Sequence, residues 1–246
     1  MSESWNPWHG CTKLSAGCKN CYVYRIDARH GAEERSREVH KNADFDLPLR
    51  RKRDKTYKLH SGQAVYTCFT SDFFLDKADE WRSEAWEMIK IRSDLHFVIF
   101  TKRIDRFHEE LPDDWGDGYK NVSIGCTIEN QAMADYRLPI FNELPIQHKS
   151  IIIAPMLEKM NISAYLNSRI EEVSVGGESG MEARACDYEW VLDIRRQCVE
   201  KKIPFCFHQT GARFIKDGKL YNVPRRYQHQ QAHKANIDFN YTKRLK

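Results

Sequence analysis

The sequence predicts an α/β protein in one domain, built as a full or partial (β/α) barrel. Two observations carry this prediction: short apolar segments alternate with helical ones, and nearly every apolar segment ends in polar or glycine residues. Apolar strands separated by helices are typical of a parallel sheet that is buried on both faces. Right-handed crossovers wind such units into a barrel or an open doubly wound sheet. The barrel is favoured because barrel sites collect polar residues from several strand ends at one face.

The first quarter of the chain has the weakest pattern. A short strand near residues 5–8 would supply one edge of the sheet. The segment from Cys21 to about Arg37 is rich in helix formers and predicts a helix. Residues 41–61 are polar and basic with no clear period, which indicates an extended connection.

The regular alternation begins at residue 64. Six apolar runs are the predicted strands: residues 64–69, 96–100, 121–126, 150–154, 172–175 and 204–207. Apolar side chains at helical spacing predict helices over residues 78–92 and 188–201, and a third helix is expected around residues 133–144. Residues 1–215 are expected to form the barrel with its N-terminal cysteine loop, and residues 216–246 a basic C-terminal extension.

Composition places the chain among ordinary globular proteins, with 41% hydrophobic and 30% charged residues. No apolar run approaches the roughly 18 residues that span a bilayer, so we expect no membrane partner. The first residues lack the basic and apolar regions of a secretory signal. We therefore expect a cytoplasmic location, in which the eight cysteines stay reduced.

Three cysteines lie close together near the N-terminus, in a C-x6-C-x2-C arrangement formed by Cys11, Cys18 and Cys21. Thiolates are preferred ligands of iron–sulfur clusters and of zinc. The two residues between Cys18 and Cys21 let both sulfurs face one metal, and a turn at Ala16-Gly17 would bring Cys11 to it. A structural zinc takes four protein ligands, whereas a site that does chemistry keeps one position open.

Three interpretations of this stretch stay open on the residues alone. The thiols could simply pack near the N-terminus, although the tight spacing and the glycines argue against that. Zinc could bind with His9 or His30 as the fourth ligand, but no second Cys-x-x-Cys pair follows. A [4Fe–4S] cluster held at three irons, with the fourth iron open, is the favoured interpretation.

Polar residues at the predicted strand ends are the other candidates for a site. Asp72, Lys102, Glu129 and Glu178 are charged, and we predict that they are catalytic residues at the open end of the barrel. The glycine-rich segment that contains Glu178 could bind a ligand through backbone N–H groups, or it could be a tight turn. Cys68, Cys126, Cys198 and Cys206 lie in apolar runs and are expected to be core thiols.

Several motifs together resemble one family. Trp5-Asn6-Pro7 runs into Gly10-Cys11-Thr12-Lys13, and Gly17-Cys18-Lys19-Asn20-Cys21-Tyr22 follows. Later matches are Pro48-Leu49-Arg50, Ser71-Asp72-Phe73-Phe74, Thr101-Lys102-Arg103, Val175-Gly176-Gly177-Glu178-Ser179-Gly180 and Ile194-Arg195-Arg196-Gln197-Cys198. Over roughly residues 5–215 the chain resembles the phage Gp37/Gp68 family, also called the DUF5131 or three-Cys-motif family, which is similar to radical S-adenosylmethionine (SAM) enzymes.

The resemblance implies a TIM-like or partial barrel of the radical SAM type. It implies a [4Fe–4S] cluster on Cys11, Cys18 and Cys21, bound SAM, and an electron donor protein that reduces the cluster. The residues expected to contact the cofactors are Tyr22, Thr70, Ser71, Gly176, Gly177, Ser179 and Gln209.

Basic residues point to a substrate class. A compact run covers residues 49–55, and the C-terminal stretch carries Arg225, Arg226, Lys234, Lys243, Arg244 and Lys246 among Tyr227 and Tyr241. Such mixtures suit phosphate contacts and base stacking, although a solvated surface and tail would look the same. We expect an enzyme that modifies or repairs a nucleic acid or nucleotide. The rival is a nucleic-acid-binding protein with a structural zinc or iron–sulfur site and no radical chemistry.

Overall fold

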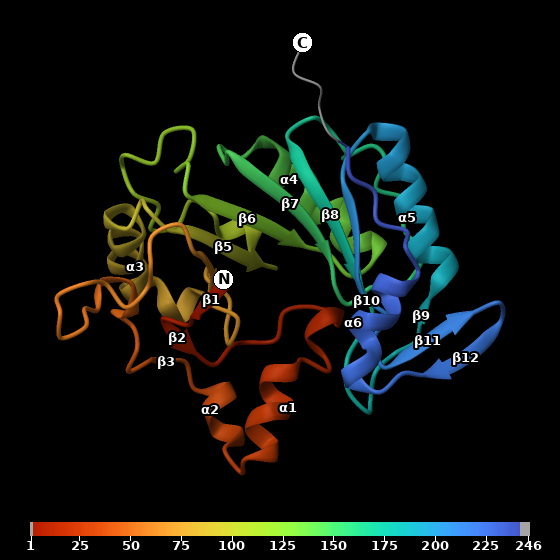
Figure 1. Ribbon diagram of the computed structural model, residues 1–246, viewed down its shortest axis with the longest axis horizontal. Coiled ribbons are helices and arrows are strands. Elements are labelled where there is room, and N and C mark those ends of the chain that lie inside the picture. Colours follow the sequence, from red (N-terminus) through yellow and green to blue (C-terminus); the bar gives the residue numbers. More distant parts are fainter. Residues whose placement is uncertain (1, 242–246) are drawn as a thin grey trace. The chain divides into compact units, whose positions relative to one another are not determined.

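A computed structural model of the protein describes residues 2–241 (Figure 1). The predicted basic residues Lys243, Arg244 and Lys246 lie outside the described part of the chain. The chain forms two compact units. The first unit contains residues 1–14, 23–125 and 143–148, and the second contains residues 15–22, 126–142 and 149–246. The boundary expected between residues 215 and 216 falls inside a strand, β11 (Arg213–Lys216).

The main sheet has seven strands that follow one another in chain order. They are β1 (Ser2–Trp5), β4 (Ala64–Thr67), β5 (His96–Thr101), β6 (Val122–Thr127), β7 (His148–Ile153), β8 (Ile170–Gly176) and β10 (Phe205–Gln209). The pairs β1–β4, β4–β5, β7–β8 and β8–β10 are parallel. A doubly wound sheet reverses its strand order at a switch point, and no reversal occurs among these strands. The prediction of an α/β fold is confirmed, and the sheet is compatible with a partial (β/α) barrel.

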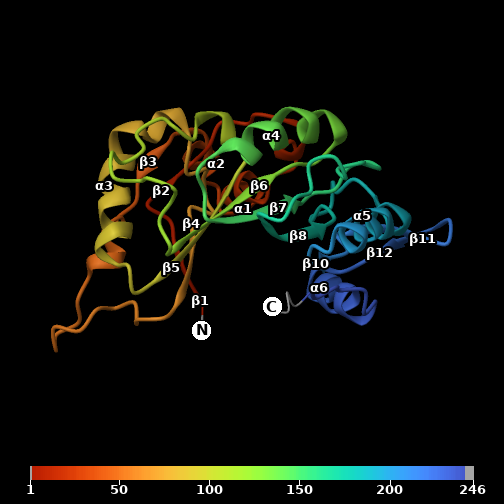
Figure 2. The same cartoon turned by 90° about the horizontal axis from the view of Figure 1, so that it is seen from above.

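The predicted helices are present with small changes at their ends. They are α3 (Asp79–Ile91), α4 (Gln131–Glu143) and α5 (Tyr188–Lys201) (Figure 2). The helix predicted from Cys21 to about Arg37 is instead two helices, α1 (Tyr22–Arg29) and α2 (Glu33–Arg37). Gly31 lies between them with a φ of 64°, in the left-handed region that ends a helix.

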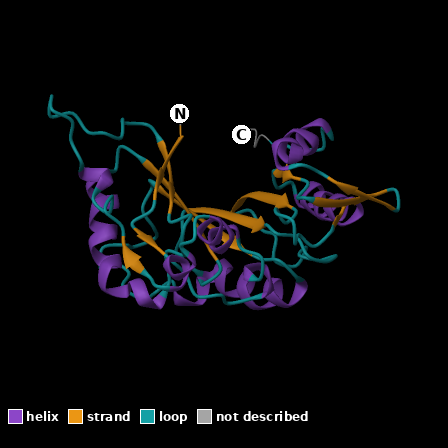
Figure 3. Cartoon of the chain, turned by 90° about the horizontal axis from the view of Figure 1, so that it is seen from below, coloured by secondary structure: helices purple, strands orange, loops and turns teal. Residues whose placement is uncertain are grey.

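Six further elements were not expected from the sequence. Short antiparallel strands β2 (Trp8–His9) and β3 (His40–Lys41) pair in the first unit. In the second unit β9 (Cys186–Asp187) pairs with β11, which forms a hairpin with β12 (Lys219–Asn222). Helix α6 (Arg225–Lys234) follows the hairpin. Figure 3 colours these helices and strands separately. Residues 216–234 are therefore largely regular structure.

An aromatic cluster forms the core of the first unit. Phe73 lies 5.3 Å from Trp8 and 4.8 Å from Trp86, measured between ring centroids, and all three are buried. Trp8 thereby fixes the chain just before the cysteine stretch, and Trp86 brings α3 to the same core. The indole N–H of Trp8 also donates to the backbone oxygen of Asp72 at 3.2 Å. The N-terminal segment is therefore packed against the end of β4.

The expected core thiols are mostly buried. Cys68, Cys126 and Cys198 are buried, whereas Cys206 is half-buried. Burial raises the pKa of the Cys198 thiol to about 12 and that of Cys206 to about 11. These thiols stay protonated at neutral pH and contribute to packing. None of the helices within residues 2–241 has the length and apolar character needed to cross a bilayer.

The end of α5 offers a test of its backbone geometry. Lys202 caps the helix with φ 58° and ψ 41°, a left-handed conformation that glycine adopts without steric cost. We expect Lys202→Gly to increase the free energy of unfolding by about 0.5–1 kcal/mol, measured by urea denaturation. The matched control, Lys201→Gly in the last helical turn, should decrease it by a similar amount. Equal effects of the two substitutions would contradict this assignment of the helix end.

Candidate functional site

The stretch that carries the three candidate ligands belongs to both units. Cys11 lies in the first unit, and Cys18 and Cys21 lie in the second. All three cysteines are half-buried, and none forms a disulfide. A short 3-10 turn, Ala16–Cys18, contains the first cysteine of the Cys-x-x-Cys pair. The Cys21 N–H donates to the Cys18 oxygen at 3.3 Å. The Cys-x-x-Cys segment is thus a compact turn whose two cysteines are half-buried.

In the first unit, the residues that follow β4 hold the chain leading to Cys11. The Thr70 hydroxyl donates to the Trp8 oxygen at 3.2 Å, and its backbone N–H donates to Asn6 Oδ1 at 3.0 Å. The Ser71 hydroxyl donates to the oxygen of Gly10. Thr70 and Ser71, expected to contact a cofactor, therefore bind the backbone just before Cys11.

Cys11 itself is held through its backbone. Its N–H donates to the Ser36 oxygen at 2.9 Å, and its oxygen accepts from the Tyr24 hydroxyl. On the far side of Cys11, Arg103 donates to the Thr12 oxygen at 2.6 Å. Arg103 follows β5, so ends of two neighbouring strands contact this segment. The backbone around Cys11 is therefore held by partners on α1, on α2 and on the segments that follow β4 and β5.

Asp72 is a buried carboxylate whose oxygens are all engaged by protein donors. Oδ1 accepts from the Thr101 hydroxyl at 2.7 Å and from the Phe74 N–H at 3.0 Å. Oδ2 accepts from the Lys102 N–H at 2.9 Å. Asp72 therefore joins the ends of β4 and β5. The Lys102 side chain is half-buried, and its ammonium forms no ion pair within residues 2–241, so this charge is open to an anionic ligand.

In the second unit, Glu129 binds the turn before Cys18. Its Oε1 accepts from the Gly17 N–H at 3.0 Å, and its Oε2 accepts from the Arg137 guanidinium at 2.9 Å. Both charged side chains are almost completely buried, at 0% and 1% exposure. A methyl group added at Gly17 would lie 3.1 Å from the Glu129 carboxyl carbon, closer than ordinary packing. A larger residue here would need the Glu129 carboxylate to shift by a few tenths of an ångström, which would disturb its contact with Arg137.

Glu178 binds the segment between Cys18 and Cys21. Its Oε2 accepts from the Asn20 side-chain amide at 3.0 Å, and the same amide donates to the Glu182 oxygen at 2.7 Å. Arg184 donates to Glu178 from both its guanidinium and its backbone N–H. Burial alone would raise the pKa of Glu178, but these donors outweigh it and the pKa is lowered. Glu178 is therefore ionised at neutral pH and engaged on both oxygens.

The glycines before Glu178 serve close packing between strand ends. A methyl group at Gly177 would lie 2.2 Å from the Thr210 oxygen, so only glycine fits. The Gly177 N–H donates to the Gln209 oxygen at 3.0 Å, and the Gln209 amide donates to the Gly177 oxygen at 2.9 Å. Gly176, Gly177 and Gln209 thus join the neighbouring ends of β8 and β10. Ser179 is half-buried just after Glu178, and Tyr22 is 39% exposed at the start of α1.

The predicted site residues therefore form two groups, one in each unit. Thr70 and Ser71 bind the chain before Cys11, and Asp72 binds the backbone of Lys102, whereas Glu129 and Glu178 bind residues beside Cys18 and Cys21. Sequence reasoning missed Asn20, Arg137 and Arg184 as supporting residues, whereas Arg103 belongs to a motif that carried the resemblance. Asn20 was detectable as a polar residue inside the Cys-x-x-Cys pair. Nothing in the local sequence distinguished Arg137 or Arg184.

The donor chemistry of the stretch suits a thiolate-bound metal, since three half-buried cysteines without disulfides are present. Within residues 2–241, no three Cys, His, Asp or Glu side chains are gathered closely enough to form a metal-binding group. His9, one of two candidates for a fourth zinc ligand, has its Nε2 2.7 Å from Asp27 Oδ2. His30, the other candidate, is exposed at the end of α1.

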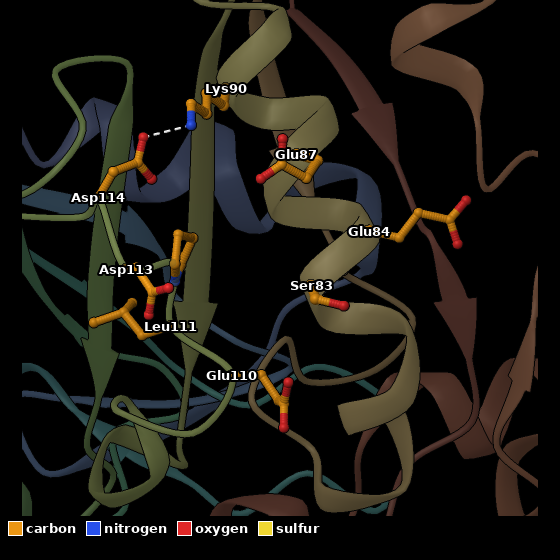
Figure 4. Close-up of a pocket in the computed structure, with 9 residues that line it drawn as sticks. Ser83, Glu84, Glu87, Lys90, Glu110, Leu111, Asp113 and Asp114 are labelled. Carbon is orange, nitrogen blue, oxygen red and sulfur yellow. Dashed lines mark ion pairs between the residues drawn. The ribbon is translucent and has the colours of Figure 1, made fainter.

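A cavity of about 610 Å³ lies elsewhere in the first unit, between one face of α3 and the loop over residues 110–114 (Figure 4). Its lining is mainly acidic, and Lys90 Nζ lies 2.5 Å from Asp114 Oδ2 across it. None of the predicted site residues lines this cavity. It is therefore separate from the candidate site.

Glu129 can be tested as a residue that positions the cysteine loop. Glu129→Ala should lower the free energy of unfolding by about 3–5 kcal/mol, because it leaves the Arg137 guanidinium buried and unpaired. In metal-free protein, Cys18 and Cys21 should also react faster with a thiol reagent. Glu129→Gln keeps an oxygen acceptor and should show smaller changes. Glu143→Ala, exposed at the end of α4, is the control, and equal behaviour of the two alanine variants would contradict this role.

The lowered pKa of Glu178 predicts a specific pH dependence. Its folded pKa lies below the ordinary value of 4.5, so its stabilising contribution is complete above that pH and is lost as the pH falls through the folded value. The unfolding free energy of Glu178→Gln should therefore fall less between about pH 6 and pH 3 than that of the unmodified chain. The control is Glu182→Gln, exposed in the same loop, which should keep the original slope.

Comparisons with known proteins give one match. No curated protein and no solved structure matches the chain. Residues 1–240 match the family described as "Protein of unknown function (DUF5131)", which is nearly the whole chain and includes all three cysteines and both groups of strand-end residues. The resemblance noted from the motifs is confirmed at this level: the chain belongs to the DUF5131 family.

Proposed function

We propose that this protein is an iron–sulfur enzyme of the radical SAM type, in which Cys11, Cys18 and Cys21 hold a [4Fe–4S] cluster. The observation that carries the proposal is three half-buried cysteines without disulfides in a C-x6-C-x2-C stretch, whose backbone is fixed by strand-end polar groups. Fixed ligands suit a reactive metal centre because its geometry must not relax between steps. The motif's resemblance to phage Gp37/Gp68 proteins and radical SAM enzymes supports the same assignment.

The chain's own residues would position and shield the reacting groups. When bound, a cluster with one open iron supplies an electron that cleaves a carbon–sulfur bond of SAM. Glu129 and Glu178 hold the loop that carries Cys18 and Cys21. Thr70 and Ser71 do the same for the chain before Cys11. Lys102 keeps an unpaired ammonium suited to the carboxylate of SAM or to a phosphate of the substrate.

The proposed substrate is a nucleic acid or a nucleotide, and the proposed partner is an electron donor protein. Support for the substrate is the basic character of residues 49–55 and of the C-terminal part of the chain. The rival function is a nucleic-acid-binding protein with a structural zinc or iron–sulfur site and no radical chemistry. If His9 were the fourth zinc ligand, it would bind through Nδ1, because its Nε2 contacts Asp27.

Metal analysis of anaerobically purified protein tests the cluster. We expect brown protein that absorbs broadly near about 400 nm and contains roughly four irons per chain. Cys18→Ala should lose most of the iron, whereas Cys206→Ala, on β10, should retain it. Colourless protein that carries one zinc per chain would refute the proposal and support the rival. Iron content that is the same in both variants would exclude Cys18 as a ligand.

Radical chemistry needs a second measurement on the iron-loaded protein. Reduction in the presence of SAM should release 5′-deoxyadenosine, and adding total cell RNA or DNA should change that rate if a nucleic acid is the substrate. Lys102→Met should raise the KM for SAM or for the substrate without lowering the iron content, because its ammonium binds an anion and not the metal. An iron-loaded protein that releases no deoxyadenosine would contradict SAM cleavage.

A further inference from the structure

The C-terminal part of the second unit exposes a group of cations that lacks acidic partners. Between residues 213 and 234 the chain has six basic residues and one acidic residue, Asp217. All six basic residues are exposed: Arg213, Lys216, Lys219, Arg225, Arg226 and Lys234. Within residues 2–241 none of them forms an ion pair with a carboxylate. We call these six residues the cationic surface.

Arginines elsewhere in the protein are commonly neutralised. Arg50 pairs with Asp44 and Asp46, and Arg106 pairs with Asp79. In the second unit, Arg137 and Arg184 each pair with a buried glutamate. The cationic surface is therefore a local departure from the charge balance of the molecule. Neighbouring like charges repel, and a polyanion that binds there would relieve that repulsion.

Two elements present the cationic surface. In the β11–β12 hairpin, Lys216 pairs with Lys219 at the tip and Arg213 pairs with Asn222 at the base. The Val223 N–H donates to the Ala212 oxygen at 2.8 Å, which ties the start of α6 to the hairpin base. Helix α6 then begins with Arg225, so Arg213, Arg225 and Arg226 lie near the junction of the two elements, and the hairpin projects beyond it (Figure 1).

The hairpin is anchored to the second unit and is not a loose tail. Phe214 of β11 is buried, and its ring lies 5.9 Å from Phe207 and 5.8 Å from Tyr188. On the other strand, all four residues of β12 are exposed. The cations are thus presented by a fixed scaffold, which lowers the entropy cost of binding a partner.

The first turn of α6 has the opposite charge from that expected at a helix start. Helix N-termini carry partial positive charge and favour acidic side chains. Helices α2, α3 and α5 follow this rule with acidic residues in their first turns, but α6 begins with Arg225 and Arg226 and has no acidic residue there. This arrangement is unfavourable for the isolated helix and becomes favourable with an anion nearby.

Two exposed tyrosines lie among these cations. Tyr221 on β12 is 43% exposed, and Tyr227 on α6 is 38% exposed. Lys219 Nζ lies 5.4 Å from the centroid of the Tyr221 ring, and the Arg226 guanidinium carbon lies 4.7 Å from that of Tyr227. A ring next to a cation can stack on a base while the cation contacts the adjoining phosphate. Such stacking requires unpaired bases.

We propose that the cationic surface, with Tyr221 and Tyr227, binds a single-stranded nucleic acid. The six cations contact phosphates, and the two rings stack on bases. The inference rests on the proposed nucleic-acid substrate and supplies the surface that would hold it. It does not depend on the metal, because no candidate ligand of the metal belongs to the surface.

The test is binding of a fluorescein-labelled 20-nucleotide oligothymidine to the full-length, metal-free chain, measured by fluorescence anisotropy at several salt concentrations. Arg225→Glu/Arg226→Glu should weaken binding at least tenfold and reduce the slope of log K against log salt by about 1.4, for two lost phosphate contacts on a single strand. Tyr221→Ala should weaken binding by about fivefold or more, and Tyr221→Phe should not.

The matched control is Lys77→Glu/Lys120→Glu, which changes the net charge equally at two exposed cations of the first unit. It should leave the salt slope unchanged. No binding at low salt, or equal loss in both charge-reversal variants, would overturn the proposal. Tighter binding to a duplex of equal length would overturn the single-stranded assignment. Cys18→Ala should bind like the unmodified chain, so that failure of the cluster and failure of this surface are told apart.

Discussion

Hydrogen bonding between strand ends and the cysteine stretch is the constraint on which the candidate site depends. A loop of small and polar residues has little apolar surface with which to fix itself, so its conformation must come from partners outside it. Buried carboxylates provide these partners in the second unit, where Glu129 and Glu178 bind Gly17 and Asn20. Hydroxyl groups and Arg103 provide them in the first. The polar residues at the strand ends thus support the candidate cysteine ligands. Few of these polar groups are left to contact a substrate.

The simplest interpretation of an acidic residue at a strand end is a catalytic acid or base. The hydrogen bonds of the three carboxylates suit a supporting role instead. A general acid or base needs an oxygen that a substrate can reach. Asp72, Glu129 and Glu178 each have both oxygens occupied by protein donors. A shift of Glu129 or Glu178 would nevertheless move the residues beside Cys18 and Cys21, and a shift of Asp72 would separate the ends of β4 and β5. Lys102 differs from the others because only its backbone is engaged, and its charge stays available.

Much of the fold could be predicted because its determinants are local. The apolar runs of β5 and β8 and the helical spacing in α3 and α5 are visible in short windows of sequence. The break at Gly31 and the helix α6 were missed, since α6 has few apolar positions and buries only Gln228 and Ala232. The cysteines and the strand-end positions were predictable from residue type and spacing. Their partners were not, because Arg137 and Arg184 gain their roles only when distant segments meet.

The hydrogen bonds of the second unit also determine when, during synthesis of the chain, the cysteine loop can form. Gly17 and Glu129 are 112 residues apart, and Asn20 and Glu178 are 158 residues apart. The cysteines leave the ribosome before the carboxylates that fix them. Closing a loop between such distant residues carries an entropy cost that local turns do not. The cysteine loop therefore cannot form these hydrogen bonds until residues 129 and 178 have been synthesised.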